Sequence, residues 1–326
     1  PGMGSAEWLW AMLNTKRPLE EKMALFWHGH FATAESKVRD YRKMIKQIET
    51  FEHHATGNFG TLAIAIAQDP AMLYYLDAGV NVKGAANENF AREVMELFTM
   101  GVGNYSEKDV REAARAFTGW NFENLDFVVD PALHDDGPKD FLGQTGNFDG
   151  GDVLDIILEQ PVTAEYIATK LFRFFVRDDV SPQLASELGA LLLDNDYELR
   201  PLLATMFLSR DFYSVATYGA HIKGPVEHVI TLLKHLGAED IPGIPDFNAT
   251  TIALGQHLLN PPSVAGWAQG QSWITPALIQ ERGGCRRTCP RTLGTGGQLK
   301  AEGNWPAVRY SYEQPSTHSR RRRKRL

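Results

Sequence analysis

Residues 87–120 read NENFAREVMELFTMGVGNYSEKDVREAARAFTGW, and this stretch has a pattern that recurs in most of the chain. A turn rich in glycine separates two segments that each have the character of a helix. Ser106, with Asp109 three residues on, approximates a capping box for the second segment, and Gly119 closes it. The stretch therefore predicts two consecutive helices joined by a glycine turn.

Most of the remaining chain shows the same helical spacing of apolar residues. Proline or a capping residue opens several segments, as at Pro18, Asp69-Pro70 and Ser181-Pro182. The period changes between about 120 and 152, where LDFVV and KDFLGQ flank a turn-rich loop. We predict a mainly α, multi-helix globular domain with a small β-hairpin excursion around 120–150. Helices are expected in 18–30, 70–79, 107–118, 164–176, 183–193, 198–209, 226–237 and 249–259.

Composition narrows the class of protein. Hydrophobic residues at 43% and charged residues at 22% are ordinary for a globular domain. No run of about 18 apolar residues is present, so we predict no membrane span. The cysteines, Cys285 and Cys289, both lie near the C-terminus. Residues 1–282 therefore have neither a disulfide framework nor a cysteine metal site.

Charge divides the chain near residue 282. Residues 283–326 carry 11 Lys and Arg against 2 Asp and Glu, whereas 1–282 carry 22 against 38. The acidic body repels phosphates, so we do not expect it to bind nucleic acid. We predict a helical domain over 1–282 and a basic, disordered tail over 283–326. The tail is interpreted either as a basic arm or, preferably, as the product of a frame shift.

The first helix of the opening stretch has a polar face with two interpretations. Glu88, Arg92, Glu93 and Glu96 lie on one side of it. The spacing of Glu88 from Arg92, and of Arg92 from Glu96, allows a ladder of ion pairs on a solvated face. Alternatively, Glu93 and Glu96 turn into a cleft as metal ligands or as an acid and base, and Arg92 binds an anionic substrate group. The face alone favours the solvated interpretation.

The segment WHGHF at 27–31 contains two candidate metal ligands, His28 and His30. Two residues apart on a helix lie on nearly opposite faces, so a shared metal requires the helix to end at Gly29. The alternative interpretation is that both histidines have core or capping roles.

Two further segments supply candidates outside the helices. His134, in the polar loop HDDGPKD, is a candidate general base, with Asp135 or Asp136 as its orienting partner. A turn built from Asp, Gly and Pro explains the same residues without chemistry. Trp267, in NPPSVAGWAQGQSW at 260–273, is a candidate substrate-binding residue, although it is equally compatible with covering the core.

Taken together, four segments resemble a bacterial family of unknown function, DUF1800. They are FWHGHF at 26–31, the stretch 87–120, HDDGPKDFLGQTGNFDGGDVLDIILEQP at 134–161, and NPPSVAGW at 260–267. The resemblance covers about residues 5–282. The family often has a histidine where this chain has Phe98, which falls on the apolar side of its helix, so no metal ligand is expected there.

The resemblance implies little chemistry, because the family has no established activity. Family members are often exported and longer, which implies a truncated N-terminus here and leaves the localisation undetermined. Their genes often neighbour those of another family of unknown function, DUF1501, which implies a partner protein. We carry two hypotheses forward: a metal-dependent or hydrolase-like site, with a divalent metal as its cofactor, and a non-enzymatic partner in an exported assembly.

Overall fold

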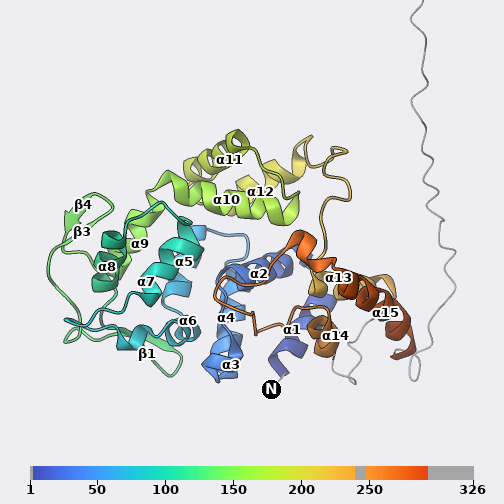
Figure 1. The fold of residues 1–326 in the computed structure, drawn as a ribbon, viewed down its shortest axis with the longest axis horizontal. Helices are drawn as coiled ribbons and strands as arrows, with labels where there is room; N and C mark the ends of the chain where they lie inside the picture. The colour runs from blue at the N-terminus through green and yellow to red at the C-terminus, as the bar shows by residue number, and fades with distance from the viewer. Residues whose placement is uncertain (1–2, 239–246, 293–326) are drawn as a thin grey trace, which may run out of the picture.

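The structure, a computed structural model, describes residues 3–238 and 247–292, and it is mainly helical (Figure 1). In chain order the elements are α1 Met3–Asn14, α2 Pro18–His30, α3 Glu35–Val38, α4 Tyr41–His53, α5 Phe59–Ala67, α6 Pro70–Tyr75, η1 Ala78–Val80, α7 Asn89–Glu93, η2 Val94–Thr99, α8 Glu107–Ala116, β1 Trp120–Glu123, β2 Asp126–Val129, β3 Lys139–Phe141, β4 Gln144–Gly146, α9 Gly150–Leu158, α10 Pro161–Phe175, α11 Pro182–Asp194, α12 Leu199–Leu208, α13 Pro225–His235, α14 Phe247–Ala253, η3 Gly270–Trp273 and α15 Pro276–Thr292. The predicted fold class is confirmed.

Helix α2 runs through the centre of the molecule. Figure 1 shows α10, α11 and α12 above it, α13 to α15 on one side, and α5 to α9 with the strands on the other. Its residues from Met23 to His28, and His30, are all buried, as expected of a helix that is covered on all sides over that length. Trp27 is fully buried, and its indole N–H donates a 3.0 Å hydrogen bond to the carbonyl of Ala55. The core therefore surrounds the FWHGHF segment.

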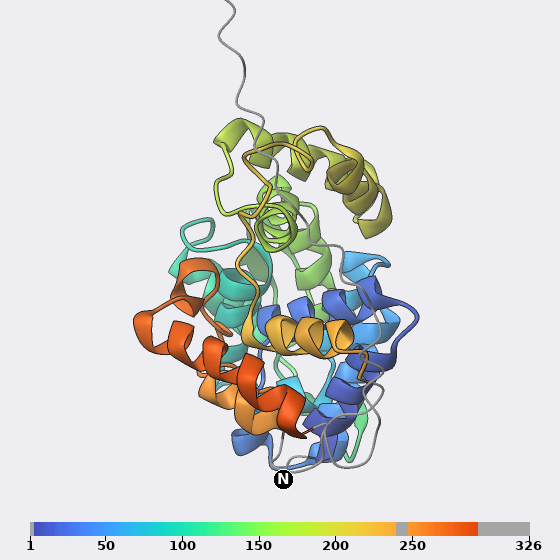
Figure 2. The ribbon, with the colours of Figure 1, turned by 90° about the vertical axis from the view of Figure 1, so that its right-hand side faces the viewer.

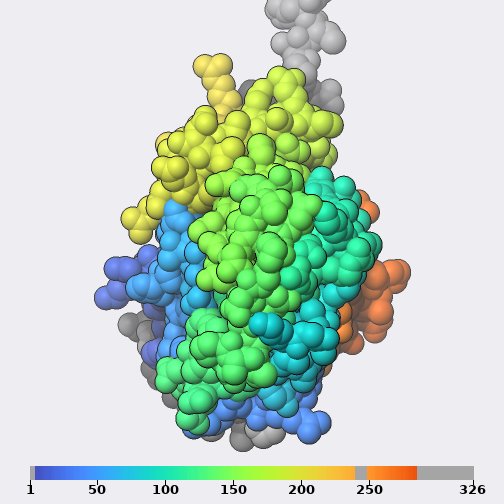
Figure 3. All heavy atoms as spheres, turned by 90° about the vertical axis from the view of Figure 1, so that its left-hand side faces the viewer, coloured from blue at the N-terminus to red at the C-terminus, as the bar shows by residue number. Residues whose placement is uncertain are grey.

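Two opposite faces of the molecule consist of different parts of the chain. From the side of α13 to α15, the C-terminal helix α15 lies in front, beside α13 (Figure 2). The opposite face is covered by the middle of the chain, from the region of α7 through the strands to α10 (Figure 3). Among the described residues, no helix is long and apolar enough to cross a bilayer.

Local signals place several helix starts where the sequence predicts them, although α10 begins at Pro161 rather than at 164. The Ser106 hydroxyl and the Asp109 carboxylate form a reciprocal capping box at the start of α8. Asp149 and Asp152 do the same for α9, and Pro18 occupies the first turn of α2. Two helices are shorter than predicted: α6 ends at Tyr75 rather than at 79, and α14 ends at Ala253 rather than at 259.

The β excursion consists of two hairpins rather than one. Strand β1 pairs antiparallel with β2, and β3 pairs antiparallel with β4. The two segments that flank the turn-rich loop thus each pair with a close neighbour in sequence instead of with each other. A tight turn joins each pair, because Asn124 and Leu142 adopt positive φ angles of 56° and 47°.

The predicted boundary at residue 282 falls inside a helix, because α15 continues to Thr292. The rest of the predicted basic tail, 293–326, lies outside the described residues, so its disorder and its origin stay predictions.

Candidate functional site

His28 and His30 occupy the last turn of α2, and both are buried. Nε2 of His28 accepts a 3.1 Å hydrogen bond from the backbone N–H of Leu259, so its proton is on Nδ1. The rings of Trp8 and Trp267 pack edge-on against it, with centroids 5.4 and 5.2 Å away. Burial lowers the pKa of His28 to about 3, so the ring is neutral at pH 7.

His30 binds a different part of the chain. Its Nε2 donates a 2.9 Å hydrogen bond to the carbonyl oxygen of Phe98, and its ring stacks on Phe26. Burial, and then the charge of Lys170, lower the pKa of His30 well below its usual value. The two imidazoles therefore have separate partners, as helical geometry requires of residues two apart.

The glycine between the two histidines contacts the NPPSVAGW segment. A Cβ on Gly266 would lie 2.1 Å from the carbonyl oxygen of Gly29, so only glycine permits this approach. The contact brings Trp267 against α2, where it is 8% exposed. Two of the four family-like segments, at 26–31 and 260–267, thus meet directly.

A narrow cleft opens beside this junction, and we call it the tryptophan cleft because Trp267 and Trp273 both line it. Its free volume is about 40 Å³, which is room for a few water molecules. It is lined by Leu25, Gly29, Arg173, Phe174, Asp178, His221, Ile222, Gly224, Glu227, Gln256, Trp267, Gln269, Gly270 and Trp273.

One wall of the tryptophan cleft is a closed network of charges. The Glu227 carboxylate pairs with Lys22 at 2.9 Å, accepts a hydrogen bond from Nε2 of His221 at 3.2 Å, and accepts another from the backbone N–H of Gly224. Burial raises the pKa of Glu227, but the His221 hydrogen bond and the Lys22 charge outweigh it and lower that pKa to about 2. Glu227 is therefore ionised, and it orients the His221 ring.

Two other charges on the tryptophan cleft are not compensated. Arg173 and Asp178 are both exposed, and within the described residues their side chains form no ion pair or hydrogen bond. Asp178 packs on Gly270, where a Cβ would lie 2.7 Å from its Oδ2 atom. The cleft thus presents a free guanidinium and a free carboxylate beside two buried indoles.

The helix with the polar face is divided by a change of pitch. After α7 ends at Glu93, residues Val94–Thr99 form the π-helical turn η2. The backbone N–H of Met100 bonds to the carbonyl of Met95, five residues back. Such turns are uncommon and often accompany functional sites. Phe98, on this turn, is buried, as predicted.

Arg92 has protein partners for its guanidinium. It forms two hydrogen bonds of 2.8 Å with Glu107 of α8, and one of 3.0 Å with Glu88. The predicted pair with Glu88 is therefore present. The predicted pair with Glu96 is wrong, because the carboxylate of Glu96 accepts a 2.9 Å hydrogen bond from the Tyr105 hydroxyl instead.

Glu93 differs from its neighbours in having no such partner. Within the described residues its carboxylate forms no hydrogen bond or ion pair. Burial, and then the charge of Glu96, raise the pKa of Glu93. Glu93 and Glu96 are both partly exposed, so they are accessible to solvent on the surface of the helix.

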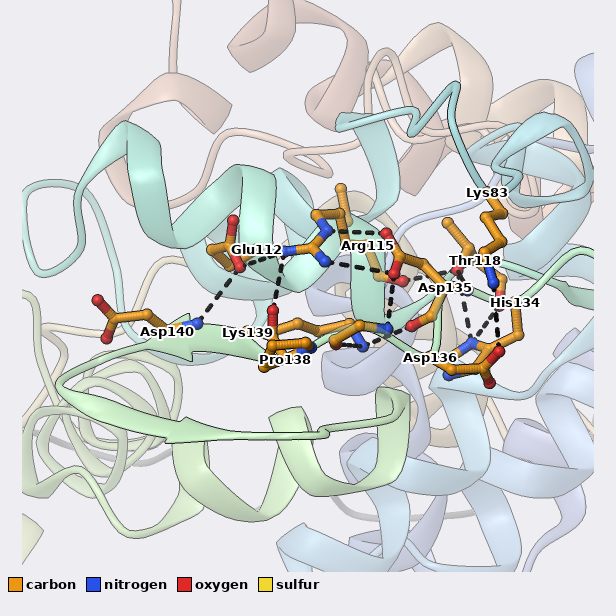
Figure 4. Close-up of polar contacts among 12 residues, drawn as sticks. Lys83, Glu112, Arg115, Thr118, His134, Asp135, Asp136, Pro138, Lys139 and Asp140 are labelled. Atoms are coloured by element: carbon orange, nitrogen blue, oxygen red, sulfur yellow. Dashed lines mark hydrogen bonds and ion pairs between the residues drawn. The ribbon is translucent and has the colours of Figure 1, made fainter.

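His134 is held by the backbone rather than by an acidic neighbour (Figure 4). Its Nδ1 donates a 2.9 Å hydrogen bond to the carbonyl of Thr118, which leaves Nε2 with the lone pair of a base. Of its predicted orienting partners, Asp136 pairs with Lys83 at 3.2 Å, and Asp135 pairs with an arginine. Neither carboxylate orients the imidazole.

That arginine, Arg115, is the centre of a polar clasp between α8 and the 134–141 segment (Figure 4). It binds both oxygens of Asp135, at 2.8 and 3.2 Å, and Glu112 at 2.7 Å. The ammonium of Lys139, 1% exposed, donates to the carbonyls of Asp135 and Gly137. The polar groups of this loop are therefore hydrogen-bonded to one another, and this structural role accounts for their presence without a catalytic function.

Sequence reasoning missed the polar residues of the tryptophan cleft. His221 and Glu227 lie around Gly224-Pro225, which was recognised only as the start of a helix. It also missed Lys170, whose pKa burial lowers to about 8 and whose Nζ lies 3.4 Å from the Tyr166 hydroxyl. The four-residue spacing of Tyr166 and Lys170 on α10 was a signal that these two lie together.

The structure also bears on the predicted metal site. Among the described residues, no group of three His, Cys, Asp or Glu is arranged to hold a metal ion.

Comparisons with known proteins identify the family of the chain. Searches of curated proteins and of solved structures return no match. The family model DUF1800, described as "Protein of unknown function", matches residues 4–290. This match covers most of the chain and includes all four segments that carry the resemblance. The chain therefore belongs to the DUF1800 family.

Proposed function

We propose that this chain is an interaction protein, and that the tryptophan cleft receives a group presented by a partner protein. The observation that carries the proposal is the uncompensated pair Arg173 and Asp178 beside Trp267 and Trp273. Arginine and tryptophan are the residue types that contribute most to protein interfaces. An opposite charge on the partner would pair with each of the two free charges.

The size of the cleft favours a partner protein over a small substrate. Sites for small molecules typically enclose several hundred Å³. The tryptophan cleft has about 40 Å³, which suits a single side chain or a chain end. A protruding group of that kind is anchored by the rest of the partner's surface.

Three of the other candidate site residues, Arg92, His28 and His30, already have partners within the chain. Arg92 pairs with Glu88 and Glu107, and the two histidines of α2 bond to backbone groups. Their contacts stabilise the chain itself. The family resemblance implies a DUF1501-type protein as the partner and an exported assembly as the setting, and we adopt both as part of the proposal.

Co-purification tests the proposal. The chain is co-expressed with a DUF1501-type protein from the same genome and isolated through a tag on one of them. We expect a stoichiometric complex, and Arg173→Glu should weaken it by about 30-fold or more, since charged interface anchors contribute about 2 kcal/mol or more. Arg210→Glu is the matched control, because Arg210 is also exposed and does not line the cleft. Absence of a complex, or equal loss in both variants, would exclude this function.

A second candidate function is acid–base or metal-dependent hydrolysis by Glu93 and Glu96, with Arg92, His134, His28 and His30 in the roles first predicted. It is favoured by the raised pKa of the unpaired Glu93 carboxylate. Elemental analysis tests its metal-dependent form. Stoichiometric metal in the parent, lost in a folded Glu93→Gln/Glu96→Gln variant, would support it. Metal-free parent protein would exclude the metal-dependent form.

A further inference from the structure

A second cavity lies between α1, α2 and α13, and we call it the α2–α13 groove. Helix α1 packs against both of the other helices (Figure 1). The groove has a volume of about 200 Å³, and it shares Leu25 and Glu227 with the much smaller tryptophan cleft. Its other lining residues come mainly from one face of α2 and one face of α13.

The buried part of the groove lining is apolar. Met12 of α1, Leu25 of α2, and Val226 and Ile230 of α13 line it, and each of these side chains is at most 9% exposed. Val226 and Ile230 are four residues apart, so they lie on the same face of α13. A hydrocarbon ligand would be favoured here, because it removes this apolar surface from water.

The carboxylates of the lining already have partners in the protein. Glu227 forms its ion pair with Lys22 at 2.9 Å, which also engages the Lys22 ammonium. Glu21 accepts a 3.2 Å hydrogen bond from the indole N–H of Trp8. These three charged groups are therefore not free to bind the head of a ligand.

The remaining charges leave one end of the groove positive. Lys223, just before α13, is exposed, and within the described residues its side chain forms no hydrogen bond or ion pair. The guanidinium of Arg282 lies beside it and donates a 2.8 Å hydrogen bond to the Lys223 carbonyl. Two positive groups thus lie together at this end, so it attracts an anionic head and repels a cationic one.

The other end of the groove is balanced in charge. Lys234, in the last turn of α13, is exposed and lines the groove with Glu21. Burial raises the pKa of Glu21, and the nearby charge of Lys234 opposes that rise. Because these two charges attract each other, the Lys234 end has less attraction for an added anion than the Lys223 end has.

The volume of the groove indicates the size of the ligand. A cavity of about 150 Å³ admits benzene, which has six carbons. The α2–α13 groove, at about 200 Å³, therefore suits a chain of slightly more carbons.

We propose that the α2–α13 groove binds an aliphatic carboxylate of about eight carbons, with its chain against Met12, Val226 and Ile230 and its carboxylate on the ammonium of Lys223. This inference does not depend on the partner proposed for the tryptophan cleft, and either can fail alone.

Calorimetric titration of the whole chain with named probes tests the chemistry of the ligand. Acetate, butyrate, hexanoate and octanoate differ in chain length alone, and 1-octanol and octylamine carry a neutral and a cationic head. We expect each added CH₂ group to tighten binding by up to about fourfold. We also expect octanoate to bind more tightly than either of the other eight-carbon probes. No saturable binding of octanoate, or octylamine binding as tightly, would overturn the proposal.

Three variants locate the ligand in the groove. Lys223→Ala should weaken octanoate binding about fivefold and leave 1-octanol binding unchanged. Lys234→Ala is the matched control, because it removes the same charge from the balanced end of the groove. Thr231→Trp should block both ligands, since Thr231 lines the groove, is partly exposed, and does not line the tryptophan cleft. Circular dichroism establishes that each variant is folded. Equal loss of octanoate binding in the two lysine variants, or full binding by folded Thr231→Trp, would overturn the proposal.

Discussion

Gly266→Ala is expected to destabilise the fold by more than about 3 kcal/mol. The new Cβ would lie 2.1 Å from the carbonyl oxygen of Gly29, a distance at which backbone must move. Gly266 also has a positive φ of 76°, which by itself costs an alanine about 1–2 kcal/mol. The movement would separate α2 from the NPPSVAGW segment and would remove Trp267 from His28.

Gly103→Ala is the matched control for this experiment. Gly103 has a similar φ of 88°, but a Cβ there would meet nothing within 4 Å. Urea unfolding of both variants therefore separates backbone strain from the clash. Equal free energies of unfolding for the two variants would show that the contact between Gly29 and Gly266 is not needed.

His28→Gln is expected to reduce the loss of stability in acid by about 2 kcal/mol between pH 7 and pH 5. The pKa of His28 falls from 6.5 to about 3 on burial, so the unfolded chain binds the proton at a higher pH than the folded chain does. The stability that this group contributes is therefore complete above about pH 6.5 and is lost as the pH falls toward 3. Glutamine does not titrate, yet its amide oxygen can still accept the Leu259 N–H.

Denaturant unfolding of parent and variant at both pH values provides the measurement. Other titrating groups, such as Asp69 and Glu52 with their raised pKa values, are common to both proteins and cancel in the difference. A parallel decline of stability in parent and variant would mean that the imidazole can be charged inside the fold.

Local signals in the sequence were sufficient for the fold class and for several helix starts. Ser106 with Asp109, and Asp149 with Asp152, satisfy backbone N–H groups within one turn, so their structure depends on neighbours in the sequence. The position of Phe98 in the core also followed from helical spacing. Such features need no knowledge of distant residues.

Partners between distant segments could not be predicted in the same way. The π-helical turn after Glu93 changes the pitch, so Glu96 meets Tyr105 rather than Arg92. Asp135 lies next to His134 in sequence, yet it pairs with Arg115 on α8. In each case the choice between acceptable partners depends on how two elements pack.

The tryptophan cleft is the clearest example of a site that only the packing of distant segments creates. It combines Gly29 of α2, Arg173 of α10, Glu227 of α13 and Trp267 of a late segment. Neither Arg173 nor Glu227 has a neighbour in sequence that marks it as part of a site. Trp267 was a candidate by residue type alone, and its neighbours follow only from the packing of Gly29 against Gly266.

Hydrogen–deuterium exchange on a complex with a DUF1501-type protein is the decisive test of the proposed interaction function. Exchange is compared in the free and the bound chain, with the Arg173→Glu variant beside it. We predict that binding protects the segments around 173–178 and 264–274, which surround the tryptophan cleft, and that the variant loses this protection. Protection confined to other segments, or unchanged exchange around the cleft in a complex that still forms, would contradict it.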